Sequence, residues 1–93
     1  MRVIETTNQF KKDFKRELKG IHKVVLASLL TRVVTLLAND EMLMAKYRDH
    51  ALTGNWSDHR DCHIKSDLVL IYRKLDKKIL QLVRLGSHSQ LSL

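Results

Sequence analysis

The sequence predicts an α+β protein in which an N-terminal helical hairpin packs on a small antiparallel β-sheet. Two observations support this fold class. Apolar residues recur at helical spacing only in the first half of the chain. The second half holds a continuous apolar run over 68–72 and a partly alternating run over 79–85, both typical of strands.

The chain is expected to begin with a short strand, RVIE (2–5), followed by a helix. Residues 6–9, TTNQ, match a capping box in which Thr6 accepts a hydrogen bond from the first helical turn. Three apolar residues at spacings of four then form one stripe: Phe10, Phe14 and Leu18. Gly20 is a typical stop signal.

A second helix is expected from His22 to about Ala38, because its apolar residues form a face wide enough to lie against a sheet. The two helices would form a hairpin. Residues 39–59 show no sustained period and contain turn residues. They predict a long connection with one strand near 46–48.

The last third of the chain predicts three strands in an antiparallel meander. Residues 60–64 could form the first strand, and LVLIY (68–72) reads as a strand buried on both faces. The polar residues 75–78 predict a turn before the strand at 79–85.

Size and composition predict one domain spanning residues 1–93. A hydrophobic content of 44% with 29% charged residues argues against a disordered chain. No apolar run approaches the ~18 residues of a membrane span. The charged N-terminus does not resemble a secretion signal, so we expect a cytoplasmic protein. Cys62 is the only cysteine, which excludes an internal disulfide.

The chain is strongly basic, with a formal net charge of +7 and a pI of about 9.9. Residues 1–39 hold eight Lys or Arg against three acidic residues, so most of the excess lies in the predicted helices. Clustered positive charge favours polyanions or an acidic protein partner. The alternative is a solvated helix surface with no partner.

The segment GNWSDHRDCHIKSD (54–67) gathers most of the reactive side chains. His59 and His63 have the spacing of a helical zinc pair, but Gly54 and Asn55 argue against a helix there. No further ligand motif is present, so we expect no metal site. In a strand, by contrast, alternation places His59, Asp61 and His63 on one side, which suits proton transfer near neutral pH. On this pattern alone, solvated loop histidines remain the simpler interpretation.

Four stretches carry a more specific signal: YRDHALTGNW (47–56), RDCH (60–63), DLVLIY (67–72) and RLGSH (84–88). Together they closely resemble the YafQ family, RelE-superfamily toxins of bacterial type II toxin–antitoxin systems. The similarity covers most of the chain. It implies a RelE-like fold and a ribosome-dependent mRNA endoribonuclease.

The resemblance also implies a set of catalytic residues: His50, His63, Asp67 and His88. In metal-free RNA cleavage, which needs no cofactor, a base activates the 2′-hydroxyl and an acid protonates the departing 5′-oxygen. We expect His50 as the base and His88 as the acid, although the reverse is equally compatible with the sequence. His63 would orient the phosphate, and Asp67 would hold an imidazole or the ribose.

The expected RNA contacts are Asp61, Arg60, Arg48, Arg84 and Ser92. The family often carries an aromatic residue at the position of Ser92, four residues after the last histidine, to stack on an mRNA base. Stacking is worth ~1–3 kcal/mol per base. The loss of this ring predicts altered codon preference or turnover, with Leu91 as a partial substitute through apolar contact.

The partners implied by the resemblance are the 70S ribosome with its mRNA and a cognate antitoxin, expected to be of the ribbon-helix-helix type. Operator DNA would be reached only through the antitoxin, and no membrane is involved. The sequence does not give the codon preference. The competing hypothesis is a non-catalytic basic protein that binds RNA or DNA, which explains the charge but not the histidines.

Overall fold

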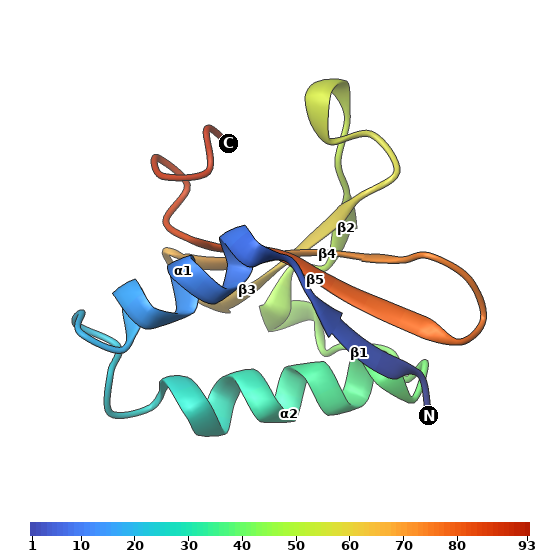
Figure 1. Ribbon diagram of the computed structural model, residues 1–93, viewed down its shortest axis with the longest axis horizontal. Coiled ribbons are helices and arrows are strands. Elements are labelled where there is room, and N and C mark those ends of the chain that lie inside the picture. Colours follow the sequence, from blue (N-terminus) through green and yellow to red (C-terminus); the bar gives the residue numbers. More distant parts are fainter.

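The computed structural model describes all residues 1–93, and its sheet has five strands in the order β1-β5-β4-β3-β2 (Figure 1). The strands are β1 (Val3–Thr6), β2 (His50–Ala51), β3 (Arg60–Lys65), β4 (Leu68–Lys74) and β5 (Ile79–Gly86). Neighbouring strands from β2 to β5 are antiparallel, which confirms the predicted meander. Strand β1 runs parallel to β5, a pairing that the sequence pattern did not predict.

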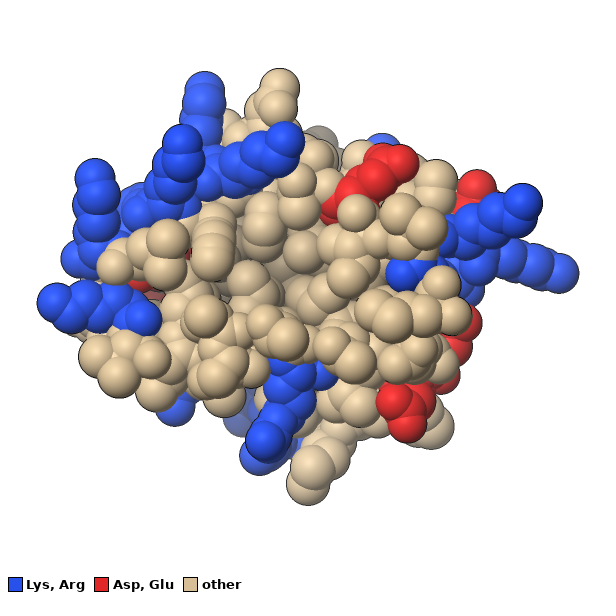
Figure 2. Space-filling view, turned by 60° about the horizontal axis from the view of Figure 1, so that its bottom comes forward, with Lys and Arg blue, Asp and Glu red and all other residues tan.

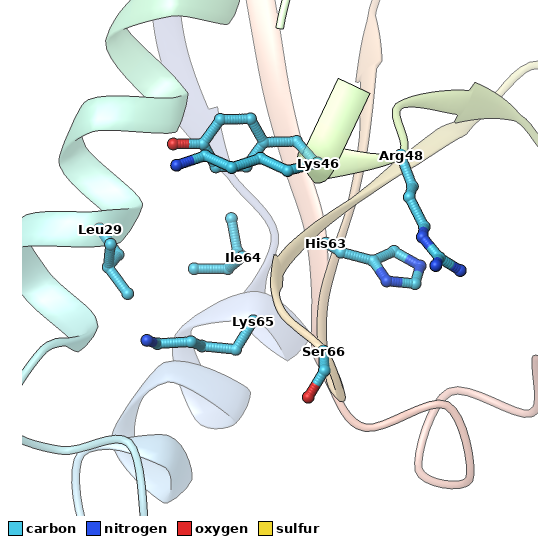
Figure 3. A pocket seen from close by; sticks show the side chains of 8 residues that line it. Leu29, Lys46, Arg48, His63, Ile64, Lys65 and Ser66 are labelled. Atoms are coloured by element: carbon cyan, nitrogen blue, oxygen red, sulfur yellow. The ribbon is translucent and has the colours of Figure 1, made fainter. Parts of the chain in front are cut away.

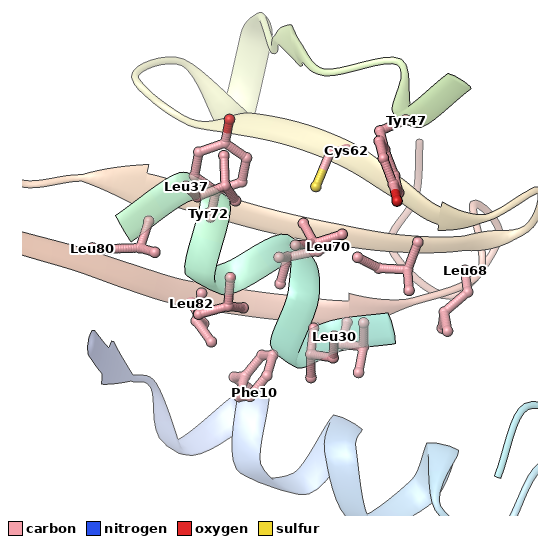
Figure 4. Close-up of a cluster of buried hydrophobic side chains, with 14 of the residues drawn as sticks. Phe10, Leu30, Leu37, Tyr47, Cys62, Leu68, Leu70, Tyr72, Leu80 and Leu82 are labelled. Atoms are coloured by element: carbon pink, nitrogen blue, oxygen red, sulfur yellow. The ribbon is translucent and has the colours of Figure 1, made fainter. Parts of the chain in front are cut away.

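Two helices, α1 (Asn8–Glu17) and α2 (Leu26–Ala38), precede the meander, as the sequence predicts. The main core lies between these helices and one face of the sheet (Figure 4). Its sheet side comes from alternate residues of the strands: Cys62, Ile64, Leu68, Leu70, Tyr72, Leu80 and Leu82. No helix is long and apolar enough to cross a membrane.

Strand β4 is buried on both faces, in agreement with its continuous apolar run. Leu70 faces the helices, whereas Val69 and Ile71 form a second, smaller cluster with Leu91 on the opposite face. In Figure 1 the C-terminal tail and the segment around β2 lie on the side of the sheet away from α2. This second side is only partly covered and carries the candidate site residues described below.

Helix α1 covers a free edge of the sheet. Strand β1 pairs with β5 only as far as Leu82, so the following residues of β5 lack a strand partner. Side chains of α1 replace it, because Asp13 Oδ2 accepts from the Leu85 N–H at 3.0 Å and Arg16 Nη2 donates to the Leu85 carbonyl at 2.6 Å. This arrangement blocks the strand edge from pairing with another chain.

The capping-box prediction was wrong by one residue. Thr7, not Thr6, is the N-cap, and its Oγ1 accepts from Phe10 N–H at 2.9 Å. Thr6 is instead the last residue of β1, and Gln9 donates to Asp13 rather than back to the cap. Pairing of Thr6 with Leu82 in the sheet therefore moves the helix start forward.

Two further boundaries differ from the prediction. Helix α2 begins at Leu26 rather than His22, and its N-cap, Val25, makes no side-chain capping bond. The strand expected at 46–48 is a short 3₁₀ helix, Ala45–Tyr47, followed by Arg48 in the left-handed conformation. This turn buries the Tyr47 side chain in the main core, which an exposed edge strand would not do.

Candidate active site

Strand alternation separates the polar residues of β3 from its core residues. Cys62 and Ile64 point into the main core, so Asp61 and His63 point to the opposite face. Strand β2 pairs with β3 in a register that places His50 directly across from Asp61. The sequence prediction that Asp61 and His63 share a face therefore agrees with the strand geometry.

His88 reaches this face from the C-terminal tail, just after β5. Its Nδ1 lies 2.7 Å from Asp67 Oδ1, and its backbone N–H donates to the same oxygen at 3.1 Å. Asp67 sits in the turn between β3 and β4. The His88 ring meets the His63 ring edge-on, with centroids 5.0 Å apart. These contacts bring together three of the four predicted catalytic residues.

Leu91 holds the tail in this position. The ends of the Arg16 and Gln90 side chains pack closely over Gly86, where a Cβ would lie 2.8 Å from Arg16 Nη2 and 2.9 Å from Gln90 Oε1. Leu91 is buried against Val69 and Ile71. The proposal that Leu91 substitutes for an aromatic base-stacking residue was therefore wrong, because its side chain is enclosed and anchors the tail.

His50 is oriented by the turn that precedes it. Arg48 has φ 48°, and this left-handed residue directs its carbonyl to His50 Nδ1 at 2.7 Å. A non-glycine residue at positive φ is strained, and such strain is common at functional sites. The Nδ1 atom of His50 faces an acceptor, as does Nδ1 of His88. Each ring therefore carries its proton on Nδ1 and leaves Nε2 for a substrate.

Asp61 is buried among the imidazoles, with only 2% of its surface exposed. His50 Nδ1 lies 3.0 Å from Asp61 Oδ1, but its N–H is aimed at the Arg48 carbonyl, and Oδ1 has no hydrogen-bond donor. Burial raises the pKa of Asp61, against the positive charge that His50, His63 and His88 contribute when protonated. Asp61 nevertheless lines a pocket of the site, and its expected contact with RNA stays a prediction.

The pKa values of two other groups in the site, His63 and Asp67, are both lowered, but for different reasons. Burial lowers the pKa of His63, with further lowering by His88 and Arg48 against the opposing charge of Asp61. The hydrogen bonds from His88 lower the pKa of Asp67, which is exposed. At neutral pH, His63 is consequently a neutral imidazole and Asp67 an anion.

Two pockets, each of about 440 Å³, flank the paired rings of His63 and His88. The first, shown in Figure 3, is lined by His63 and Arg48 together with Lys46, Lys65, Leu29 and Ile64. The second is lined by His50, Asp61 and His88, with Trp56, Ser92 and Leu93. The site is thus an open groove with the histidines between two recesses.

The three predicted RNA-contacting arginines lie in different environments. Arg48 is exposed, has no carboxylate partner, and points toward His63 in Figure 3. Arg60 lies on the core-facing side of β3 and pairs with Asp49 at 3.3 Å. Arg84 donates to the buried Asp13 at 2.8 Å. Only Arg48 is free beside the histidines, so the structure does not support the phosphate contacts expected of Arg60 and Arg84.

The remaining singled-out side chains have simpler roles. Ser92 has φ 58° and lines the second pocket, where it leaves more room than an aromatic ring would. Trp56 packs against the Val69–Ile71–Leu91 cluster and also lines that pocket. His59 contacts the edge of Trp56, and Cys62 is buried in the core. No group of three or more His, Cys, Asp or Glu side chains is arranged to hold a metal ion.

Lys46 and Lys65 were missed by the sequence analysis, although both line the pocket beside His63. Single lysines in polar segments carry no pattern of their own. Their only signal was closeness in sequence, since Lys46 stands two residues before Arg48 and Lys65 two residues after His63. The strand register shifts between His63 and Lys65, so alternation does not place these two side chains together.

Two comparisons with known proteins point to the same family over nearly the whole chain. The family model described as a bacterial toxin of type II toxin–antitoxin system, YafQ, matches residues 2–93. The mRNA interferase toxin YafQ of Escherichia coli is 42% identical over 91 residues, covering 97% of this chain and 95% of that protein.

Solved structures of relatives share the fold. A copper-bound mutant toxin from Helicobacter pylori superimposes with a TM-score of 0.86 at 39% identity, covering 98% of this chain and 99% of the other. The toxin in the E. coli DinJ–YafQ complex gives a TM-score of 0.82 at 39% identity, with 98% of each chain covered. Both similarities extend over the helices, the sheet and the tail.

Proposed function

Because the chain belongs to the YafQ family of type II toxin–antitoxin toxins, we propose that it is an endoribonuclease that cleaves mRNA on the translating ribosome. The observation that best supports this activity is the convergence of His50, His63 and His88 around the buried Asp61. A binding protein without chemistry would not need three imidazoles around an unsatisfied carboxylate.

The proposed reaction is an in-line attack of a ribose 2′-hydroxyl on the adjacent phosphorus. One imidazole Nε2 takes the proton of the hydroxyl, the P–O5′ bond breaks, and a second imidazole protonates the departing 5′-oxygen. The products are a 2′,3′-cyclic phosphate and a 5′-hydroxyl. This scheme uses side chains alone and is metal-independent.

The hydrogen bonds support His88 as the acid. Its Nδ1 lies 2.7 Å from the ionised Asp67, which orients the ring as a carboxylate orients the histidine of a catalytic triad. The Nδ1 of His50 faces a neutral carbonyl, which fixes the tautomer with a basic Nε2. We assign His50 as the base, His63 and Arg48 as ligands of the phosphate, and Asp67 as the residue that positions His88.

Alanine replacement of each histidine tests the proposal. His50→Ala, His63→Ala and His88→Ala should each lower single-turnover cleavage on programmed ribosomes by at least ~100-fold, a typical acid–base factor. His59→Ala and His22→Ala are matched controls that should retain the wild-type rate. Equal growth arrest by wild type and His88→Ala in cells would instead favour a non-catalytic binder.

We also propose that an antitoxin resembling DinJ neutralises this chain and that the pair represses its own operon through the antitoxin's DNA-binding segment. A relative has been crystallised with DinJ. The net charge of +7 favours an acidic partner. Figure 2 shows Lys and Arg side chains at both ends and at the lower edge of one face, with the Asp and Glu side chains mostly on its right half. Co-purification with the neighbouring operon product and operator binding by the pair, but not by the toxin alone, test this.

A further inference from the structure

The pocket beside His63 lies where the outer edge of β3 has no strand partner. Strand β2 pairs only with Arg60 and Asp61, so the outer edge of β3 is open beyond that point. The pocket is bordered there by the 3₁₀ helix Ala45–Tyr47 and by Leu29 of α2. A chain that enters the histidine site along this edge must pass over the pocket.

Three cationic side chains line this pocket, and none is neutralised. Lys46, Arg48 and Lys65 are exposed, no Asp or Glu lines the pocket, and none of the three forms an ion pair. Four arginines elsewhere on the fold form ion pairs with acids, namely Arg2, Arg16, Arg60 and Arg84. Unpaired cations gathered in one recess attract an anion more strongly than isolated surface lysines do.

The close-up in Figure 3 shows how these groups are divided. Arg48 and His63 lie together on one side, whereas the amino groups of Lys46 and Lys65 extend toward Leu29 on the other. Ile64 lies between the two lysines. The Lys46 amino group sits 5.2 Å from the centre of the Tyr47 ring, a cation–π contact that limits its freedom.

We propose that this pocket binds the RNA nucleotide next to the scissile phosphate, with Lys46 and Lys65 contacting its phosphodiester and Leu29 and Ile64 contacting its sugar. This inference rests on the proposed function and extends it to two residues that act on substrate position. The scissile phosphate would lie at His63 and Arg48, and the neighbouring one at the lysines.

The second pocket strengthens this assignment by contrast. No Lys or Arg lines it, and Asp61 contributes a carboxylate to its wall. Its lining includes the Trp56 ring and the apolar side chains of Leu52 and Leu93. The cationic side chains therefore favour the backbone phosphates on the His63 side of the groove.

Binding of a non-cleavable RNA tests the pocket apart from catalysis. A 2′-O-methyl hexanucleotide lacks the attacking hydroxyl, so its affinity for the purified protein can be measured by fluorescence anisotropy over a range of salt concentrations. The Lys46→Gln/Lys65→Gln variant should bind the RNA about tenfold more weakly at low salt. The plot of log binding constant against log salt concentration should become less steep by about one. Lys11→Gln/Lys12→Gln, which removes the same charge from α1, is the matched control and should match wild type.

The outcomes separate the two proposals. Equal affinity and salt slope in the pocket variant and the control would overturn the pocket. A loss of affinity for vacant ribosomes with unchanged oligonucleotide binding would also overturn it, because the lysines would then contact ribosomal RNA. Weakened oligonucleotide binding in a protein that cleaves no mRNA would support the pocket while removing the proposed function.

Discussion

Two buried carboxylates, Asp13 and Asp61, show how differently this fold treats the same chemical group. Asp13 lies under α1 at the β5 edge and accepts hydrogen bonds from Gln9, Arg16, Arg84 and the Leu85 N–H. Asp61 lies on the opposite side of the sheet, and its Oδ1 has no donor. Burial alone would raise the pKa of both, but the bonds to Asp13 outweigh burial and lower its pKa, whereas the pKa of Asp61 stays raised.

The difference indicates which region serves architecture and which serves chemistry. A satisfied buried carboxylate stabilises the fold by joining α1 to the edge of β5. An unsatisfied one costs stability and is retained where its charge acts on neighbouring groups. Here those groups are the three imidazoles of the candidate active site.

The largest expected effect follows from removing the charge of Asp13. Asp13→Asn should lower the free energy of unfolding by about 3 kcal/mol, because Arg84 and Arg16 would lose their shared anion. The value lies at the low end for broken buried pairs because both arginines remain partly exposed. Urea unfolding followed by circular dichroism gives the measurement. A change below about 0.5 kcal/mol would show that the Asp13 network is not structural.

Asp61→Asn should instead preserve the stability of the protein and lower its cleavage rate. Its free energy of unfolding should equal or exceed that of wild type, since the substitution removes an unsatisfied buried charge. Single-turnover cleavage should nevertheless fall at least about tenfold, and loss of the negative charge should shift the acidic limb of the pH–rate profile to lower pH. A destabilised variant with an unshifted profile would assign Asp61 to the architecture instead.

The pH dependence of stability should separate the same two residues. Because the folded pKa of Asp13 is lowered, its contribution is present above the ordinary Asp pKa of ~3.9 and is lost as the pH falls through the folded value. The folded pKa of Asp61 is raised, so stability falls as the pH rises from ~3.9 through that value. As the pH is lowered from 7 to 3, the free energy of unfolding of Asp13→Asn should therefore approach that of wild type from below. Any stability that Asp61→Asn has in excess of wild type should also diminish over this range. Parallel curves for all three proteins would contradict this.

The sequence predicted the helices, the meander and the alternation that places Asp61 with His63, because these follow from local periodicity. It did not predict the pairing of β1 with β5 or the cover of the β5 edge by Asp13, since both depend on contacts between distant segments. The ion pair of Arg84 with Asp13 was not predicted for the same reason. Burial of Asp61 could not be read from its neighbours either, because the tail and β2 together enclose it.

Asp67 provides the smallest expected effect and the sharpest contrast with Asp13. Both acids bond a basic side chain, but Asp67 is exposed, so its pair with His88 should add little to stability. Asp67→Asn should therefore unfold at the same urea concentration as wild type, while cleavage falls several-fold because the protonated His88 loses its anionic partner. Asp58→Asn, which removes an exposed acid outside the site, is the control for net charge and should leave the rate unchanged. If Asp67→Asn shifted the unfolding midpoint but not the rate, the Asp67–His88 pair would fasten the tail rather than position an acid. Asp67 would then be a structural carboxylate like Asp13 and not one that serves the reaction.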